Sequence, residues 1–235
     1  MKNPWTKITW NNTVADCDKL IINPTFCAEN GIDIANLPEP YTGNIDSNVV
    51  CLNLNPGIGK CNPCFRFDKE FLRLTQRTLR HQIDHSFWIG DDLKCKHGGL
   101  HEGCEWWKSR TNELRKELGE IHLNMFVIEF FPYHTKSTIK FPQLPSDEYR
   151  NQLLNDAMDA NKLIVIMRGK SLWYDIKDKS LGDVGLRLEK QHTNKVILSN
   201  PRNPYFTPSC FKGNDWMKLI QELSKPTAHR YKTLI

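Results

Sequence analysis

No apolar segment of this 235-residue sequence is long enough to cross a bilayer. The longest, residues 126–131 and 163–167, fall far short of the ~20 residues that a transmembrane helix needs. The N-terminus lacks the apolar core of a secretion signal, and the chain has neither an internal repeat nor a low-complexity tract. We therefore expect a cytoplasmic protein without a membrane partner, in which residues 1–235 form a single domain.

The charge balance lacks an acidic excess. The formal net charge is +5, and the segment from residue 200 to the end holds six Lys or Arg against two acids, a local excess of +4. A mild basic excess permits nucleic-acid binding without requiring it. We therefore consider contacts with phosphate groups in this C-terminal segment.

Eight cysteines are present, and without an export signal they are expected to remain reduced thiols. Cys61 and Cys64 form a CxxC pair, and Cys95 and Cys104 follow with two nearby histidines. A second tight pair is lacking, because Cys95 and Cys104 are nine positions apart. Incidental thiols are the main interpretation, and a structural zinc site on these four cysteines is the alternative.

Four short apolar segments, rich in β-branched residues, are typical of buried parallel strands. They are Val49–Leu54, Asn124–Phe130, Leu163–Met167 and Val196–Ser199. Amphipathic patterns predict helices at residues 68–83 and 106–118, from residue 145 onward, and at residues 216–223. This alternation predicts a three-layer αβα fold with a central four-stranded parallel sheet. We expect residues 1–45 to form an irregular N-terminal wrap and residues 57–123 to form a long crossover insertion with a functional role.

Two of the predicted strands end on an Asn-Pro pair, at Asn55-Pro56 and Asn200-Pro201. Asn and Pro favour turns, and open α/β sheets place their ligand crevices at the carboxyl ends of the strands. Two carboxamides are therefore expected to face one cleft.

The strand ends carry a resemblance to a known family. Leu54-Asn55-Pro56-Gly57 resembles the first motif of the uracil-DNA glycosylase superfamily, especially the Gly-x-Asn-Pro-Gly pattern of its mismatch-specific branch. Three later segments, residues 126–132, 163–171 and 199–204, are similar in order to its second strand, its strand ending in Gly-Lys and its last motif. The resemblance covers residues 45–210.

The resemblance implies a four-stranded parallel sheet and hydrolysis of the bond between a base and deoxyribose. That reaction passes through an oxocarbenium-like sugar and requires an oriented water but no metal, so no cofactor is expected. Asn55 is expected to position the water, and a cap on nearby backbone is its structural alternative. Asn200 stands where the family often has a histidine that stabilises the departing base. His134 is a candidate for proton transfer or a phosphate contact, with a structural role as its alternative.

Glu129 ends the second strand, where family members that excise uracil often have asparagine. A carboxylate accepts from an exocyclic amine and offers no donor to O4 of uracil, so a cytosine-type base is expected, with adenine as the alternative. If burial protonates Glu129, it can also donate to the ring N3. The structural alternative is a glutamate that pairs with Lys136 or Arg168.

The remaining candidates are expected around the same pocket. Asn53 replaces the glycine of the family pattern and adds an amide, and Phe87 or Trp88 is the expected stacking face for a flipped base. Contacts with DNA are expected from Lys136, Arg168, Arg202, Tyr205 and Phe206. Of these, Tyr205 or Phe206 would fill the gap left by the extruded nucleotide, although core packing is equally compatible with both.

These observations predict a monomeric DNA glycosylase that flips a damaged or modified base, of cytosine type rather than uracil, in repair or antiviral defence. Two alternatives remain open. One is a non-catalytic nucleic-acid binder or modified-base sensor, and the other is a zinc-stabilised interaction module.

Overall fold

A computed structural model describes residues 2–60, 62–83, 101–119, 124–136 and 139–227. Its strands are β1 (Ile32–Asp33), β2 (Tyr41–Gly43), β3 (Val49–Asn53), β4 (Met125–Glu129), β5 (His134–Thr135), β6 (Leu163–Ile166) and β7 (Lys195–Ile197). Its α-helices are α1 (Pro24–Asn30), α2 (Asn62–Phe65), α3 (Lys69–Leu79), α5 (Glu102–Arg110), α6 (Asn112–Leu118), α7 (Asp147–Asp159), α8 (Lys170–Tyr174), α9 (Val184–Leu186) and α10 (Asp215–Leu223). Four short 3-10 or π helices complete this part of the chain: η1 (Pro4–Lys7), η2 (Asp16–Asp18), η3 (Arg187–Gln191) and η4 (Pro208–Cys210).

The central sheet has five strands in the order β2-β4-β3-β6-β7. The four predicted strands are present and mutually parallel, with bounds that differ from the prediction by one or two residues. The prediction of a purely parallel four-stranded sheet is wrong, because β2 adds an antiparallel edge beside β4. This three-residue strand lies in the segment that was expected to be irregular, and it ends on Gly43, whose φ of 94° favours glycine.

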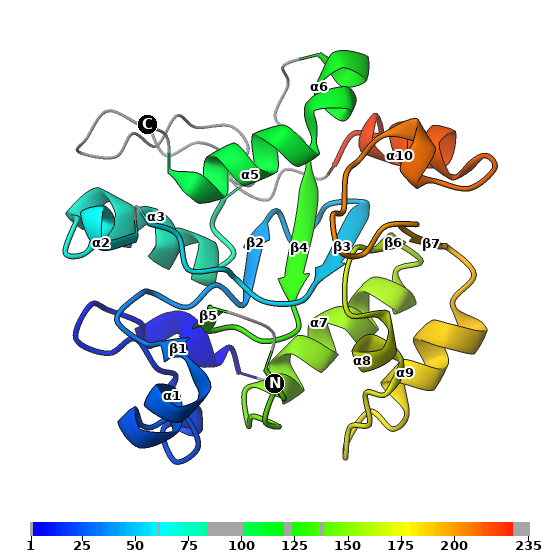
Figure 1. Cartoon of the computed structure of the whole chain (residues 1–235). Helices are drawn as coiled ribbons and strands as arrows, with labels where there is room; N and C mark the ends of the chain where they lie inside the picture. Colours follow the sequence, from blue (N-terminus) through cyan, green and yellow to red (C-terminus); the bar gives the residue numbers. More distant parts are fainter. Residues whose placement is uncertain (1, 61, 84–100, 120–123, 137–138, 228–235) are drawn as a thin grey trace.

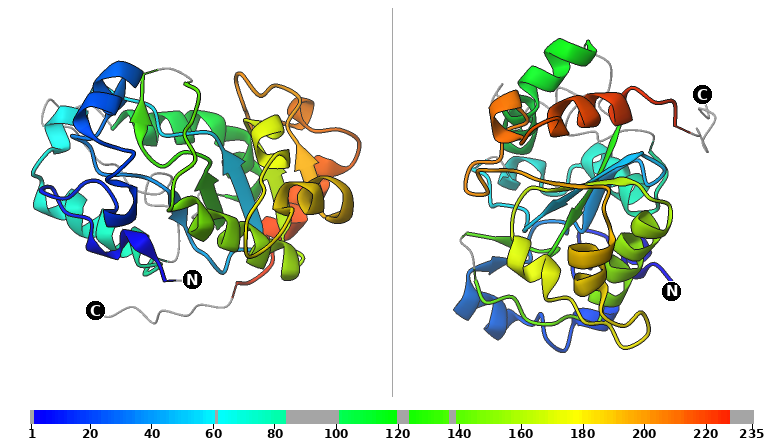
Figure 2. Two further views of the ribbon diagram at one scale, coloured as in Figure 1. Left: turned by 90° about the horizontal axis from the view of Figure 1, so that it is seen from below. Right: turned by 90° about the vertical axis from the view of Figure 1, so that its right-hand side faces the viewer.

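Helices lie on both faces of the sheet (Figure 1). The β3–β4 connection places α3, α5 and α6 on one face, whereas α7, α8 and α9 lie on the other. Helix α10, which follows β7, returns to the first face and packs near α6 (Figures 1 and 2). In the sheet, β3 lies between β4 and β6. The chain therefore runs from β3 to β4 on one side of β3, and then from β4 to β6 on the other side. Such a reversal of direction is where open α/β sheets bind ligands.

The predicted helix at residues 106–118 is two helices. The first begins four residues earlier, at Glu102, because the His101 ring caps it by accepting from the Gly103 N–H at 3.0 Å. It ends at Arg110, and the hydroxyl of the next residue, Thr111, donates to the Trp107 carbonyl at 2.7 Å, a local alternative to helical bonding. Among the described residues, no helix is both long and apolar enough to cross a membrane.

Asp18 fixes the N-terminal segment to the domain. Its fully buried carboxylate accepts from the Tyr133 hydroxyl at 2.8 Å, and from the Ser146 hydroxyl at 2.7 Å and N–H at 3.0 Å. Ser146 immediately precedes α7, and Tyr133 immediately precedes β5. Asp18 therefore joins three segments that are far apart in the sequence.

Replacing Asp18 by alanine is expected to lower the free energy of unfolding by about 3–5 kcal/mol, since it leaves three buried donors without an acceptor. The melting temperature should fall by roughly 10 °C. Asp16→Ala is the control, because the Asp16 side chain is half exposed and a surface ion pair such as the one it forms with Lys19 contributes little to stability. Thermal denaturation that is equal for both variants would contradict this role of Asp18.

Candidate functional site

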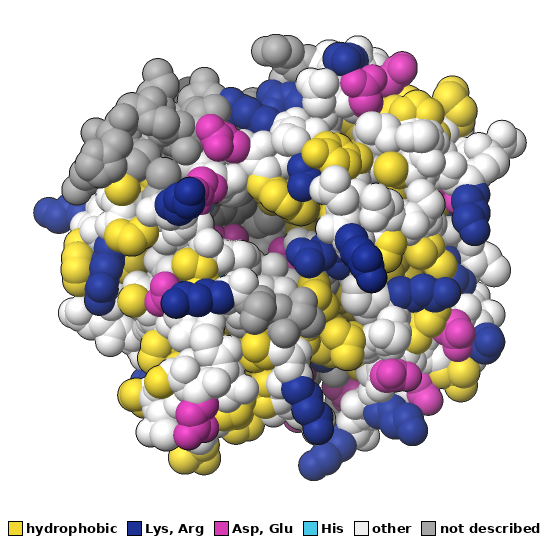
Figure 3. Space-filling model, viewed as in Figure 1, with side chains coloured by type: hydrophobic (Ala, Val, Ile, Leu, Met, Phe, Trp, Pro, Cys, Tyr) yellow, Lys and Arg dark blue, Asp and Glu magenta, His cyan; other side chains and the backbone are white. Residues whose placement is uncertain are grey.

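A pocket of about 600 Å³ opens at the carboxyl ends of β3, β4 and β6. Its size is within the range of small-ligand sites. Figure 3 shows the molecule hollowed here, with acidic side chains inside the hollow and Lys or Arg side chains on its border. The lining comprises Glu39, Asn53, residues 55–60, Asn62, residues 101–103, Trp106, Trp107, Glu129, residues 134–136 and Arg168. Six predicted site residues are among them: Asn53, Asn55, Glu129, His134, Lys136 and Arg168.

The Asn55 amide is held in one orientation. Its Nδ2 donates to the Thr135 hydroxyl at 2.8 Å and to the Pro56 carbonyl at 3.0 Å. Because a carbonyl only accepts, the contact with Pro56 identifies the nitrogen side of the amide. The Oδ1 atom has no hydrogen bond to any described residue and belongs to a half-buried side chain on the pocket wall. The Asn55 side chain thus makes the predicted contact with nearby backbone through Nδ2, and its Oδ1 remains available to accept a hydrogen bond from water or a ligand.

Strand β5 holds the Asn55 turn in place. The Thr135 hydroxyl accepts from Asn55 Nδ2, and the Thr135 N–H donates to the Pro56 carbonyl at 3.2 Å. The neighbouring His134 contacts the Gly57 carbonyl through Nδ1 at 2.7 Å and the Leu37 carbonyl through Nε2 at 3.0 Å. Consecutive residues of β5 therefore bind consecutive residues of the turn.

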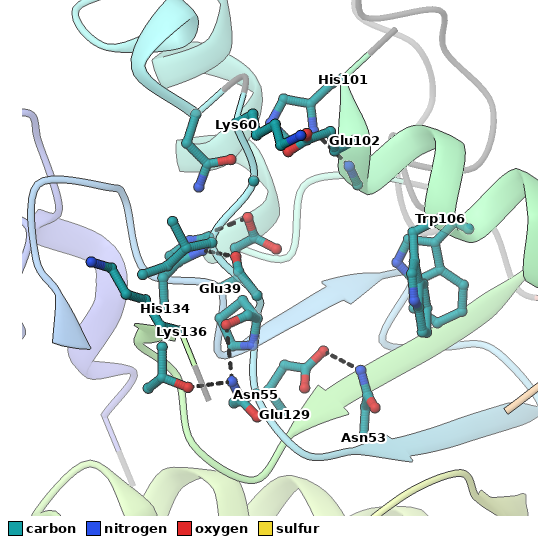
Figure 4. Close-up of a pocket in the computed structure, with 18 of the residues that line it drawn as sticks. Glu39, Asn53, Asn55, Lys60, His101, Glu102, Trp106, Glu129, His134 and Lys136 are labelled. Atoms are coloured by element: carbon teal, nitrogen blue, oxygen red, sulfur yellow. Dashed lines mark hydrogen bonds and ion pairs between the residues drawn. The ribbon is translucent and has the colours of Figure 1, made fainter. Parts of the chain in front are cut away.

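His134 is engaged by backbone on both ring nitrogens. A carbonyl oxygen only accepts, so a ring nitrogen that carries a proton donates to the carbonyl that it faces. Glu39 Oε1 also lies 3.5 Å from Nε2 (Figure 4). Burial raises the pKa of Glu39, and the charge of His134 opposes that rise. The geometry gives His134 a positioning role, with neither nitrogen free for the proton transfer that the sequence suggested.

Glu129 and Asn53 form a pair at the ends of β4 and β3. These two residues are register partners in the sheet, and Asn53 Nδ2 donates to Glu129 Oε1 at 2.9 Å (Figure 4). The other oxygens, Asn53 Oδ1 and Glu129 Oε2, are buried and have no hydrogen-bond partner. The pKa of Glu129 is raised to about 8, because burial, together with the charge of Glu39, raises it more than the Asn53 hydrogen bond and the Arg168 charge lower it. The alternative ion pair of Glu129 with Lys136 or Arg168 is not observed.

Three cations surround the pocket without an ion-pair partner among the described residues: Lys60, Lys136 and Arg168. The two lysines are exposed, and Arg168 is half-buried directly after β6. The Arg168 N–H donates to the Leu52 carbonyl at 3.3 Å, which ties it to the neighbouring strand β3. Unpaired cations of this kind are suited to anionic groups such as phosphates.

Trp106 is a pocket residue that no motif of the sequence predicted. It lies on α5, is half-buried, and stands across the pocket from the Asn55 turn (Figure 4). The Arg110 guanidinium lies 5.1 Å from the Trp106 ring centre and 4.2 Å from that of Tyr205. Tyr205 is therefore connected to the pocket wall through Arg110. The adjacent Trp106 and Trp107 indicate an aromatic part of a helix. The sequence does not show that this part of the helix lines a pocket.

The last predicted motif lies outside the pocket lining. Asn200 is exposed, and its Oδ1 accepts from the Asn203 N–H at 3.2 Å, which is a loop contact. Arg202 is exposed and has no ion-pair partner among the described residues. Phe206 has no exposed surface and packs near Phe211, so its prediction as a DNA-contacting wedge is wrong and its core alternative holds.

Several candidates lie outside the described residues: Phe87, Trp88, Cys61 and Cys95. Of the other two cysteines in the zinc alternative, Cys64 is on α2 and Cys104 is buried on α5. No group of three or more His, Cys, Asp or Glu within the described segments is arranged to hold a metal ion.

Comparisons of this chain with protein-family models, with curated proteins and with solved structures found no match. The mixed α/β fold, with its mostly parallel five-stranded sheet, is therefore established from the structure alone.

Proposed function

We propose that this chain is a monofunctional DNA glycosylase, a divergent member of the uracil-DNA glycosylase superfamily with that family's three-layer αβα fold. In this proposal it hydrolyses the N-glycosidic bond of a flipped damaged or modified base, of cytosine type rather than uracil. The observation that carries the proposal is the fixed Asn55 amide, whose Oδ1 is left free beside a buried pair of base-reading groups.

Asn55 has the properties needed to orient water. Its two donated hydrogen bonds hold the amide plane, so Oδ1 can accept from a water at a fixed place in the pocket. As the C1′–N bond lengthens, the sugar develops positive charge, and the oriented water is ready to add to C1′. A neutral amide does not remove the proton of this water, so the mechanism depends on departure of the base before attack.

DNA is supported as the substrate by the surroundings of the pocket. Lys60, Lys136 and Arg168 provide unpaired charge for backbone phosphates, and Trp106 provides a half-buried ring for stacking. A base in duplex DNA reaches such a pocket only after it is flipped out of the stack. Tyr205, held beside Trp106 through Arg110, is the remaining candidate for the residue that fills the vacated space.

A second candidate is a non-catalytic sensor of modified bases. It is favoured by the neutral Asn55, which is no general base, and by the position of Asn200 outside the pocket lining. A sensor would use the same pocket and cations for binding but release no base.

Release of a base distinguishes the two candidates. Duplexes carrying cytosine, 5-methylcytosine, 5-hydroxymethylcytosine, uracil, mismatched thymine or alkylated adenine are incubated with the protein, and strand scission after alkali is measured. The proposal expects scission at one of the modified cytosines. Tight binding of a duplex without scission of any would establish the sensor instead.

Trp106→Ala should weaken binding of a duplex with a non-cleavable 2′-fluoro target nucleotide by about 5- to 100-fold, since stacking of a base on an aromatic ring contributes ~1–3 kcal/mol. Trp106→Phe, which keeps a stacking face, should remain within a few-fold of the original protein. Fluorescence anisotropy measures both affinities. Unchanged binding by the alanine variant would exclude Trp106 as the stacking face.

A further inference from the structure

We propose that Glu129 is a catalytic acid that protonates the ring N3 of the departing base, which restricts the substrate to bases with an unsubstituted, proton-accepting N3. This inference rests on the proposed glycosylase activity and assigns it a substrate class and a leaving-group mechanism. Cytosine and its C5-substituted derivatives meet the requirement. Uracil and thymine do not, because their N3 already carries a hydrogen.

The hydrogen bonds of the pair place the acidic proton. Glu129 Oε1 accepts from Asn53 Nδ2, so a proton on the carboxyl group belongs on Oε2, the buried oxygen without a partner. Asn53 Oδ1 is likewise buried and unpaired. Both groups line the 600 Å³ pocket. The pair therefore presents one donor and one acceptor to a ligand, from residues that are neighbours in the sheet.

The surroundings of Glu129 favour the neutral acid. No cation forms an ion pair with it among the described residues, and a buried carboxylate without a counter-charge is strongly disfavoured. The charged groups facing it are Glu39 and Arg168 on the pocket side. On the other side Asp147 and Arg150 pair with each other at 2.9 Å. The raised pKa of Glu129, about 8, agrees with this geometry.

The edge of cytosine complements this donor and acceptor. Its N3 accepts and its N4 amine donates, so N3 can receive the hydrogen of Glu129 Oε2 while N4 donates to Asn53 Oδ1. If Glu129 were ionised, both it and Asn53 Oδ1 would present acceptors. Glu129 would then face the lone pair of N3, and cytosine would bind less tightly.

Proton transfer to N3 makes cytosine a better leaving group. Without it, the C1′–N1 bond would break to leave an unstable anion, and Asn200, predicted to assist departure, does not line the pocket. In the proposed step the proton of Glu129 Oε2 moves to N3, and the electron pair of the C1′–N1 bond moves into the ring. Cytosine then leaves as a neutral tautomer with hydrogen on N3. Water adds its oxygen to C1′, and the proton it loses returns through solvent to the Glu129 carboxylate.

Glu129→Gln separates proton transfer from binding, because glutamine keeps the size and hydrogen-bonding capacity of the neutral acid but cannot give up a proton. On a duplex with 5-hydroxymethylcytosine, single-turnover release should fall about 100-fold or more. Affinity for the matching 2′-fluoro duplex should stay within threefold. Release by the unaltered protein should be constant below pH 8 and fall toward tenfold per pH unit above it, because only the protonated form is active. Glu117→Gln, at an exposed position of α6, is the control and should match the unaltered protein.

The inference and the proposed function fail in different ways. If the unaltered protein releases bases but Glu129→Gln releases them equally fast, or if only uracil and thymine are released, the acid role of Glu129 is overturned and the glycosylase remains. If 3-methylcytosine, whose N3 is blocked, is released as fast as 5-hydroxymethylcytosine, the N3 requirement is also overturned. If no duplex loses a base, the proposed function itself fails.

Discussion

Asn55→Ala is expected to slow base release by about 100- to 1000-fold. Removing a preorganised polar group that stabilises a transition state has an effect of this size in other enzymes. The variant loses Oδ1 of the Asn55 amide, which two hydrogen bonds from Nδ2 hold in place and which is free to accept from water. It should still bind a 2′-fluoro target duplex, since the Asn53–Glu129 pair and the cations remain. Single-turnover scission and anisotropy measure the two properties separately.

The matched control for this variant is Asn112→Ala, an asparagine replaced at an exposed position of α6. It should release bases at the rate of the unaltered protein. An Asn55→Ala variant that keeps its melting temperature and releases bases within threefold of that rate would contradict the proposed placement of the water.

Replacing Lys60, Lys136 and Arg168 together by glutamine is expected to weaken binding of duplex DNA by roughly 100-fold at moderate salt. Each cation that contacts a phosphate releases counterions on binding, so the slope of log affinity against log salt should decrease by about 3. The reason is structural, since all three side chains border the pocket without an ion-pair partner among the described residues. Anisotropy titrations over a range of salt concentrations measure both quantities.

A second triple variant tests whether position matters or only net charge. Lys177, Lys179 and Lys190 are exposed and do not line the pocket, and their replacement by glutamine changes the net charge by the same amount. This variant should lose little affinity and keep most of its salt slope. Equal losses in the two triple variants would show that the pocket border is not the DNA-binding surface.

The sequence predicted the site best where strand ends determine it. Asn55, Glu129 and Arg168 lie at the carboxyl ends of three different strands, and they meet because parallel strands present those ends at one edge of a sheet. The apolar, β-branched composition of those strands was sufficient to locate them. The structure places these three residues around one pocket, whereas Asn200, which was expected to face the same cleft as Asn55, does not line it.

Other features depend on contacts that no local pattern encodes. β2 is only three residues long, too short for a strand periodicity. The Thr135 hydroxyl reaches Asn55 across 80 positions of sequence, and Trp106 lines the pocket because of where α5 packs. Asn200 and Phe206 belong to a segment whose composition suits either a binding loop or a core contact, and only the fold distinguishes the two.

The most direct test of this account is a crystal structure of the Asn55→Ala protein bound to a duplex with one 2′-fluoro-5-hydroxymethylcytidine. This nucleotide is expected to be rotated out of the helix, with its ring against Trp106 and its N3 and N4 at Glu129 and Asn53. Phosphates on either side should contact the cations of the pocket border. A base that remains stacked in the duplex, or DNA bound to another face of the protein, would contradict it.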